Sequence, residues 1–328
     1  MSDDLAVVRA DFPAYRIWRE QARGCARYVA RSRYLRVSPH TVVTADLREL
    51  RDALEPARVA EPGPLVPGQP NIARMYNYLL GGKDHIDADR VAVDAVLTEF
   101  PEVAGVARAN REFLTRAVRY LARKGVSQFL DLGSGLPASP NVHETAREVN
   151  PGARVVYVDN DPVVLAHARA LLAVDRDVGV VAGDVRDPAD LLAEQALTGL
   201  IDVTEPVGVL LLSVLHFLTP AQAHAVVGAF REWMAPGSYL VISAGTSTGT
   251  DPGLIRALQD ACGGTAHVTG HTAAEIRAWF DGLSLVRPGL VNVWAWRPDT
   301  FRQPRPPRAR FLGGVARKPG ARRPRWQP

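Results

Sequence analysis

The stretch from Val126 to Ala138, VSQFLDLGSGLPA, constrains the fold more than any other part of the chain. A short apolar run stops at Asp131 and is followed by Gly133, Ser134 and Gly135, a pattern typical of a buried parallel strand that turns tightly toward a helix. Glycine suits such a turn because it adopts positive φ and lets the backbone approach a ligand closely. The stretch therefore predicts a nucleotide-like ligand at the carboxyl end of a strand.

Two kinds of ligand use a turn of this type. Dinucleotides favour the pattern G-x-G-x-x-G or A, which Gly133, Gly135 and Ala138 satisfy. Sites for S-adenosylmethionine more often have an acidic residue two positions before the first glycine, where Asp131 stands. Each pattern also occurs in turns that bind nothing. The choice between the two ligands therefore depends on the spacing of residues farther along the chain.

Composition is that of a globular protein, and we expect a cytoplasmic one. The chain has 328 residues and 47% hydrophobic content, enough for one large α/β domain with appendages. No apolar run reaches the roughly 18 to 20 residues that cross a bilayer, and the acidic start lacks the basic region of a signal peptide. Cys25 and Cys262 lie far apart without a C-x-x-C partner, so no disulfide framework or metal site is indicated.

The net charge of +4 is unevenly distributed. Residues 1–60 have three more basic than acidic groups, and the tail after Asp299 has nine Arg or Lys and no acid, which leaves −8 for the residues between them. An acidic middle argues against a nucleic-acid groove there. The basic tail could dock on nucleic acid or anionic lipid, but we favour a solvated end.

Proline, glycine and charge divide the chain into four parts. Residues 1–55 predict a small appended α+β module of unknown role, and residues 56–70 predict a Pro/Gly linker. Residues 71–299 form the main domain, which opens with a helical lid. Residues 300–328 are rich in Arg and Pro, have no apolar period and are expected to be disordered.

Within the first part, alternating residues predict a hairpin around Gln21 to Gly24. His40 to Thr44 could add another strand. Asp46 is a plausible N-cap for a helix with Leu47, Leu50 and Leu54 on its apolar side.

The main domain begins with PNIARMYNYLLGGKDHIDADR. Its apolar residues recur at helical spacing, and Gly81 with Gly82 would end the helix. The Gly-Gly-Lys sequence is no phosphate loop, because Asn77 stands where the first glycine should be and Asp84 where Ser or Thr should follow the lysine. The acidic residues that follow are best explained as residues in the first turn of the next helix, where a negative charge complements the helix dipole.

Acidic residues also follow the next two predicted strands. The strand over 153–158 finishes at Asp159, and a carboxylate there can accept hydrogen bonds from the two ribose hydroxyls. The strand over 178–182 ends in Gly183 and Asp184, where a small residue and a carboxylate could contact an adenine ring.

The last predicted strands favour a site for S-adenosylmethionine over a site for a dinucleotide. Residues 206–215 form an apolar run typical of a central parallel strand, with Ser213 and His216 at its carboxyl end. Farther on, Leu283–Val286 and Leu290–Arg297 flank a Pro-Gly turn and predict a hairpin. We therefore expect an α/β fold with a seven-stranded sheet, parallel except for an antiparallel C-terminal strand, and helices on both faces, as in the Rossmann-like class I methyltransferases.

Several long segments in order resemble one family. They are PNIARMYNYLLGGKDHIDADR, QFLDLGSGLPASPNVHETA, RVVYVDNDPVVLAHARALL, PVGVLLLSVLHFL and LVRPGLVNVWAWRPD. Together they are similar to the bacterial, actinobacterial-type S-adenosylmethionine-dependent methyltransferase family formerly known as a domain of unknown function. The likeness covers about Gln69 to Asp299 and implies S-adenosylmethionine as cofactor without implying an acceptor.

The resemblance and the chemistry together assign the cofactor site. Asp131 and the glycine turn would hold the methionine end, Asp159 the ribose and Asp184 the adenine, while Tyr76 or Tyr78 of the lid would lie near the sulfonium. Cation–π attraction there is worth about 1 kcal/mol, although ordinary helix packing also explains each tyrosine. The full set of cofactor candidates is Tyr76, Gly82, Asp131, Gly133, Ser134, Gly135, Asp159, Asn160, Gly183, Asp184, Val185 and Ser213.

His216 is the candidate catalytic residue. It could act as a general base if the acceptor is a hydroxyl or an ammonium, since its ordinary pKa lies near neutrality. Lining the pocket or simple packing are the alternatives, and His143 is a weaker candidate. We expect in-line methyl transfer to a small molecule; an NAD-dependent oxidoreductase and a non-catalytic cofactor-binding regulator remain the competing functions.

Overall fold

The computed structural model describes residues 5, 8–9, 12, 15–22, 25–32, 41–60, 68–263, 265–299 and 308–320, and statements below refer to these. They fall into two compact units, which divide between residues 64 and 65. Each unit is described by itself.

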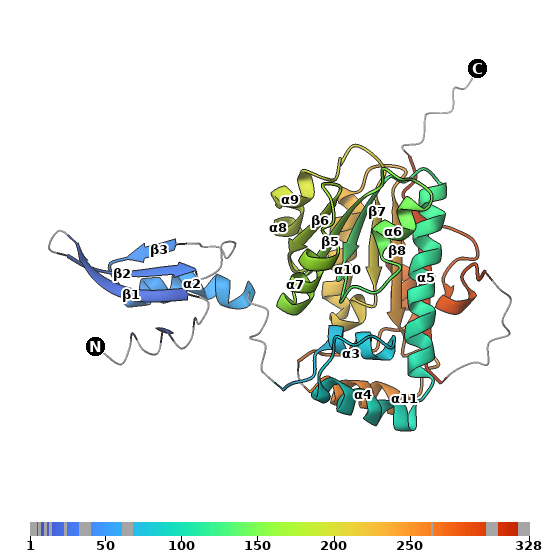
Figure 1. The fold of residues 1–328 in the computed structure, drawn as a ribbon, viewed down its shortest axis with the longest axis horizontal. Coiled ribbons are helices and arrows are strands. Elements are labelled where there is room, and N and C mark those ends of the chain that lie inside the picture. Colours follow the sequence, from blue (N-terminus) through green and yellow to red (C-terminus); the bar gives the residue numbers. More distant parts are fainter. Residues whose placement is uncertain are drawn as a thin grey trace, which may run out of the picture. The chain divides into compact units, whose positions relative to one another are not determined.

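The first unit is a three-stranded antiparallel sheet with a helix (Figure 1). Its elements are β1 (Tyr15–Ala22), β2 (Cys25–Ser32), β3 (Thr41–Thr44) and α2 (Leu47–Ala60). The Asp46 carboxylate accepts hydrogen bonds from the backbone N–H groups of Arg48 at 2.7 Å and Glu49 at 3.2 Å, which caps the helix. Leu50 and Leu54 are fully buried against the sheet. The predicted hairpin, third strand and capped helix are confirmed.

The linker expected over 56–70 begins too early. Helix α2 runs to Ala60 and so includes Pro56. A single proline removes one backbone donor from a helix, while the residues after it, Ala57 to Ala60, include good helix formers. Residues 61–67 lie outside the described part of the chain.

The second unit is built on an eight-stranded sheet in the order β10-β11-β8-β7-β4-β5-β6, with β9 also paired to β11. Neighbours from β8 to β6 pair in parallel, and every pair that involves β11 is antiparallel. The strands are β4 (Gln128–Leu132), β5 (Arg154–Asp159), β6 (Val178–Ala182), β7 (Gly208–Leu212), β8 (Tyr239–Gly245), β9 (Ser284–Leu285), β10 (Val291–Asn292) and β11 (Phe311–Arg317).

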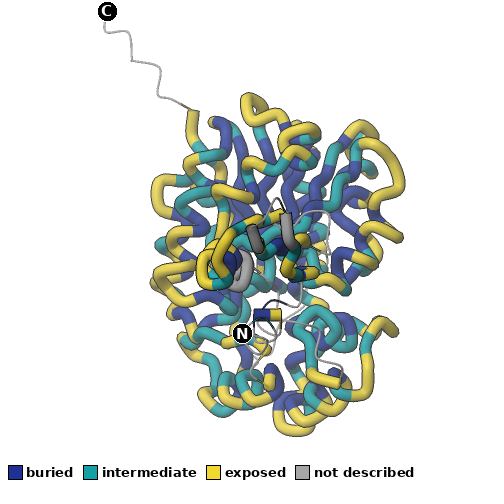
Figure 2. Tube along the Cα trace, turned by 90° about the vertical axis from the view of Figure 1, so that its left-hand side faces the viewer, coloured by how far each residue is buried: buried dark blue, intermediate teal, exposed yellow. Residues whose placement is uncertain are grey.

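Helices cover both faces of this sheet because successive side chains of each buried strand point to opposite faces. Phe129 packs with one helix layer and Leu130 with the other. The first layer is α5 (Val103–Arg123), α6 (Val142–Arg147) and α7 (Pro162–Leu171); the second is α8 (Pro188–Ala193), α9 (Gln195–Thr198), α10 (Pro220–Trp233) and α12 (Ala273–Ala278). Figure 2 shows buried residues along the strands and exposed turns outside them. The predicted fold class is confirmed, but the sheet has eight strands where seven were expected, because β9 and β10 both pair with β11.

Three further helices pack together at the end of the sheet where the parallel strands finish (Figure 1). They are α3 (Ile72–Leu79), α4 (Asp87–Glu99) and α11 (Pro252–Ala261). Their shared apolar cluster includes Met75, Phe100 and Leu254. The helical segment expected to act as a lid therefore lies over the strand ends that carry the predicted site.

The antiparallel part of the sheet differs from expectation in two ways. The predicted hairpin is wrong, because β9 and β10 each pair with β11 and the expected strand over 290–297 is only two residues long before a 3-10 turn. The partner of β8 is instead β11, which comes from the tail expected to be disordered.

The apolar run of β11 is short and carries two glycines, which hides it in an Arg- and Pro-rich context. A Cβ on Gly313 would lie 2.9 Å from the Val293 side chain, and one on Gly314 would lie 2.8 Å from the Phe280 ring, so the glycines let neighbouring side chains pack closely.

Two basic groups of the tail bind to other parts of the domain. The Arg308 guanidinium pairs with Glu102 at 3.2 Å and donates to the Glu99 carbonyl at 2.6 Å. Lys318 donates to the Arg231 carbonyl at the end of α10 at 2.8 Å. Residues 300–307 and 321–328 lie outside the described part, so docking by the whole tail stays untested.

Replacing Val315 tests the role of β11. Val315 is fully buried in the sheet, so Val315→Asp places an unpaired charge in the core at a cost of several kcal/mol. We expect thermal unfolding followed by circular dichroism to show loss of the cooperative transition. Arg317→Ala, at the exposed end of the same strand, should leave the melting temperature nearly unchanged. If Val315→Asp unfolded with the same cooperative transition as Arg317→Ala, the position of β11 in the core would be contradicted.

Candidate functional site

The glycine turn after β4 is held against β5. The backbone N–H groups of Gly133 and Ser134 donate to the Val158 carbonyl at 2.8 Å and 3.1 Å. Gly133 has φ of 68° and Gly135 has φ of 65°, which favour glycine. A Cβ on Gly133 would also lie 2.5 Å from the Val214 side chain. Both the conformation and the packing therefore require a residue without a side chain at 133.

Asp159 joins the ends of β4 and β5. One carboxylate oxygen accepts a hydrogen bond from the Gly135 N–H at 2.9 Å, and the other accepts from the Asp161 N–H at 2.9 Å. Burial nevertheless raises the pKa of Asp159 to about 6, because it outweighs these hydrogen bonds. The structure thus brings Asp159 to the same corner as the glycine turn.

Asp131 is buried at this corner, with 6% of its surface exposed. Burial raises its pKa to about 7, and the Asp159 charge adds to the rise, while the Arg111 guanidinium opposes it. Arg111 comes from α5 and donates to the backbone carbonyls of Ala138 and, at 2.9 Å, Pro140. Two carboxylates and one guanidinium therefore meet beside the glycine turn.

The predicted adenine residues lie at the ends of β5 and β6. The Asp184 carboxylate accepts from the Asn160 amide at 3.0 Å and from Arg186 Nε at 2.9 Å. Burial alone would raise the pKa of Asp184, but the hydrogen bonds from Arg186 and Asn160 outweigh it and hold the pKa below its usual range. Gly183 donates to the Asp159 carbonyl at 3.0 Å. Val185 is partly buried beside them.

Tyr76 connects the lid helix to the end of β7. The Tyr76 hydroxyl donates to the Ala107 carbonyl at 3.1 Å, and the Asn110 amide donates both to this hydroxyl at 2.9 Å and to Ser213 Oγ at 3.0 Å. Burial raises the pKa of Tyr76, which keeps its hydroxyl protonated. The Tyr78 hydroxyl donates to Asp94 of α4 at 2.9 Å. Of the two tyrosines, Tyr76 is therefore the one linked to the predicted site.

Gly82 lies within the lid and serves its packing. A Cβ there would lie 2.4 Å from the Asn77 side chain, whose oxygen accepts from the Asp84 N–H at 3.0 Å. Buried Asp89 holds the same segment through Arg74 Nε at 2.7 Å. This packing accounts for Gly82 without a ligand.

A second link ties the lid to the strand ends. The Asn71 amide donates to the carboxylate of Asp161, which also caps α7 through the Val163 N–H at 2.7 Å. Two independent polar contacts, one at β7 and one at α7, therefore hold the lid over the predicted site.

His216 lies just beyond β7, in the 3-10 turn Leu215–Phe217. Its ring is 4.3 Å from the Phe217 ring and 5.6 Å from the Phe311 ring, measured between centroids. Burial, with a smaller effect of His271, lowers the pKa of His216 to about 4. The ring is therefore neutral at pH 7 and holds an added proton poorly. His143 instead contacts the Tyr157 hydroxyl through Nδ1 at 2.9 Å.

Sequence reasoning missed Asn110, Arg111, Asp161 and Phe311. Asn110 had a detectable signal, because it occupies the apolar stripe of α5 between Ala107 and Phe113 yet is polar, and it is 3% exposed. The other three have ordinary local contexts, and only the fold places them here.

Three buried polar atoms at the corner have no hydrogen-bond partner among the described residues: Asn110 Oδ1, Arg111 Nε and Ser134 Oγ. They comprise one acceptor, one cationic donor and one hydroxyl. Buried polar atoms are usually paired, and this combination suits an amino-acid group that carries both an ammonium and a carboxylate.

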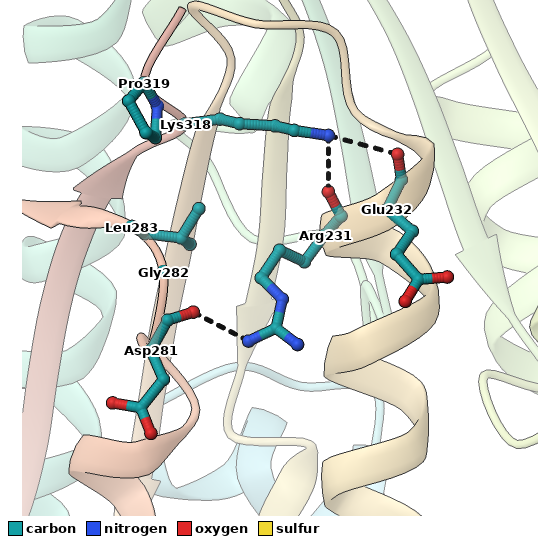
Figure 3. Close-up of a pocket in the computed structure, with 7 residues that line it drawn as sticks. All are labelled: Arg231, Glu232, Asp281, Gly282, Leu283, Lys318 and Pro319. Carbon is teal, nitrogen blue, oxygen red and sulfur yellow. Dashed lines mark hydrogen bonds between the residues drawn. The ribbon is translucent and has the colours of Figure 1, made fainter. Parts of the chain in front are cut away.

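A separate open pocket of about 500 Å³ lies at the other end of the sheet, where β11 finishes beside the start of β8 (Figure 3). Its Lys318 ammonium donates to the Arg231, Glu232 and Met234 carbonyls, and Arg231 donates to the Asp281 carbonyl at 2.7 Å. The basic groups drawn there are engaged with backbone, so the pocket is not the predicted site.

Comparison with known proteins gives a consistent result. A model of the S-adenosyl methyltransferase family matches residues 59–319. A crystal structure from Thermobifida fusca YX, assigned as a methyltransferase, is 43% identical with a TM-score of 0.74, and the match covers 79% of this chain and 98% of that one. A DUF574 family protein from Streptomyces avermitilis MA-4680 is 39% identical with a TM-score of 0.72, over 76% and 98% of the two chains. No curated protein matches.

The chain belongs to the S-adenosyl methyltransferase family. It is an S-adenosylmethionine-dependent methyltransferase, as the resemblance implied. In the described part of the chain, no helix has both the length and the apolar character to cross a membrane.

The raised pKa of Asp131 predicts a measurable effect on stability. Its pKa rises from 3.8 in the unfolded chain to about 7 in the fold. Between these values the unfolded chain releases the proton while the folded chain keeps it, so this group lowers the free energy of unfolding as pH rises from 4 to 7. Asp131→Asn should therefore increase the free energy of unfolding at pH 8, by an amount on the order of 2–4 kcal/mol, and so raise the melting temperature there while changing it much less at pH 4.5.

Asp175→Asn is the matched control for this experiment. Arg147 lowers the pKa of the exposed Asp175 to about 2, so its ionised form stabilises the fold. Calorimetry of this variant at pH 8 should show no gain in melting temperature. If the melting temperature of Asp131→Asn at pH 8 were at or below that of the unmodified protein, the raised pKa of buried Asp131 would be contradicted.

Proposed function

We propose that the protein transfers the methyl group of S-adenosylmethionine in line to a small-molecule acceptor, in a site at the carboxyl ends of β4, β5 and β7. The observation that carries this proposal is the corner at which Asp131, the glycine turn and Asp159 meet. It combines a turn whose backbone a ligand can approach closely with one buried and one partly buried carboxylate and with unpartnered polar atoms.

Each end of the cofactor has a matching set of groups. Asp131 and Asn110 Oδ1 would accept from the ammonium of the methionine end, and Arg111 with Ser134 would donate to its carboxylate. Asp159 would accept from the ribose hydroxyls. Asp184 and Val185 would contact the adenine, with Asn160 holding Asp184 in place.

The lid would align the two reactants. When bound, S-adenosylmethionine supplies a methyl group on a sulfonium, a good leaving group. The residues of the protein chiefly fix positions and exclude water. Tyr76 is held by Asn110 and Ala107 close to Ser213, so the lid and the end of β7 form one rigid wall of the site.

His216 is better suited to orient the acceptor than to hold its proton. With a pKa of about 4, the imidazole is a neutral hydrogen-bonding group at pH 7, and a protonated ring in this buried position is unstable. We therefore assign the candidate catalytic histidine to positioning the acceptor, with the released proton passing to water.

Replacing the ribose-binding carboxylate tests the cofactor assignment. Asp159→Asn should weaken binding of S-adenosylhomocysteine by about tenfold to a hundredfold, as expected from hydrogen bonds that involve a charged group. Isothermal titration calorimetry measures this directly. Asp175→Asn, the same substitution on an exposed carboxylate, should leave the affinity unchanged, and a circular dichroism melt shows whether each variant is folded.

Three results would contradict the proposal. A folded Asp159→Asn protein with undiminished affinity would exclude the ribose contact. Persistent absence of label transfer from labelled S-adenosylmethionine to a broad extract of small metabolites, with the cofactor bound, would favour a regulator without turnover. Binding of NAD in place of S-adenosylhomocysteine would favour the oxidoreductase.

A further inference from the structure

A second polar cluster lies beyond β7 and β8, on the other side of β4 from Asp159. We call His216, Thr269 and His271 the histidine–threonine cluster. The Thr269 N–H donates to the His216 carbonyl at 2.7 Å, and His271 Nε2 lies 3.0 Å from the Leu215 carbonyl. The loop that carries Thr269 and His271 is therefore bound directly to the turn that carries His216.

Each member of the cluster has a buried polar atom with no partner among the described residues: His216 Nδ1, Thr269 Oγ1 and His271 Nδ1. His271 Nε2 faces the carbonyls of Leu215 and Leu218, at 3.0 Å and 3.1 Å, so a neutral His271 carries its proton there and offers a lone pair at Nδ1. Unpaired polar atoms cost free energy when buried. Three in one cluster indicate a binding site rather than a contribution to stability.

The surroundings of His216 are aromatic, and a charged group near the cluster, Glu275, interacts with His271 instead. None of its side chains forms an ion pair in the described part of the chain, and the low pKa of His216 keeps that ring neutral. The rings of Phe217 and Phe311 flank His216. His216, Thr269 and both phenylalanines remain partly exposed, so the unpartnered atoms lie just beneath the surface of the domain.

We propose that the histidine–threonine cluster recognises the acceptor, and that the acceptor is an uncharged aromatic molecule with a phenolic hydroxyl. The inference rests on the proposed function, because it names the substrate class of that site. A hydroxyl donates to a histidine lone pair and accepts from the threonine hydroxyl, and the partly exposed phenylalanine rings beside His216 can pack against a flat ring. Amines and carboxylic acids are charged at pH 7, and uncharged buried groups disfavour them. In the overall exchange, the methyl group replaces the hydroxyl proton, which passes to water.

The test measures equilibrium binding of three fluorescent probes of similar shape in the presence of saturating S-adenosylhomocysteine. The probes are 2-naphthol, which has the hydroxyl, 2-methoxynaphthalene, which lacks its proton, and 2-naphthoate, which is anionic. We expect 2-naphthol to bind about tenfold more tightly than either, the effect of one to two hydrogen bonds. Thr269→Val keeps the side-chain shape and removes the hydroxyl, so it should reduce this preference to about threefold or less. Thr198→Val, on the exposed surface of α9, is the control.

Binding of S-adenosylhomocysteine to each variant separates this inference from the proposed function. If the cofactor product binds and 2-naphthol shows no preference over the other probes, the phenolic acceptor is wrong while the cofactor site stands. If Thr269→Val retains both cofactor binding and the full preference, the cluster does not recognise the hydroxyl. Failure of the unmodified protein to bind S-adenosylhomocysteine would instead contradict the proposed function.

Discussion

The hydrogen bond from the Gly135 N–H to the Asp159 carboxylate is the interaction on which the site depends. Together with the bonds from Gly133 and Ser134 to the Val158 carbonyl, it fastens the turn after β4 to the end of β5. The turn can take this path only because its glycines adopt positive φ. A carboxylate and a bare backbone are thereby presented together at one edge of a parallel sheet, which is where such sheets bind ligands.

This arrangement lowers the stability of the folded domain. Asp131 is buried and Asp159 partly buried, close enough for the charge of Asp159 to raise the pKa of Asp131. Buried carboxylates without a full set of partners destabilise a fold. Cationic and hydrogen-donating groups of a ligand relieve that cost. Strain of this kind is common at functional sites, where supporting structure holds it in place. Here the support comes from α5, whose Arg111 and Asn110 reach the corner from one face of the sheet.

The parallel half of the sheet, and the corner at which Asp131, the glycine turn and Asp159 meet, could be predicted from the sequence because their signals are local. Strands such as 153–158 are continuous apolar runs, and acids mark their ends. The pairing of β8 could not be predicted in this way, since β11 is a short strand with two glycines that follows a proline-rich segment. Its position depends on contacts of Gly313 and Gly314 with distant side chains. Arg111 was missed because its place in a long amphipathic helix explains it locally, and only tertiary packing brings it to Asp131. Asn110 is polar on the apolar stripe of the same helix, but its partner Ser213 is distant in the sequence.

A crystal structure of the protein with S-adenosylhomocysteine tests the central claim most directly. It should show the ligand between the glycine turn and β5, with its ribose hydroxyls within hydrogen-bonding distance of Asp159 and its amino group beside Asp131. Density for the ligand at the opposite end of the sheet, in the pocket lined by Arg231 and Lys318, or a ribose with no contact to Asp159, would contradict it.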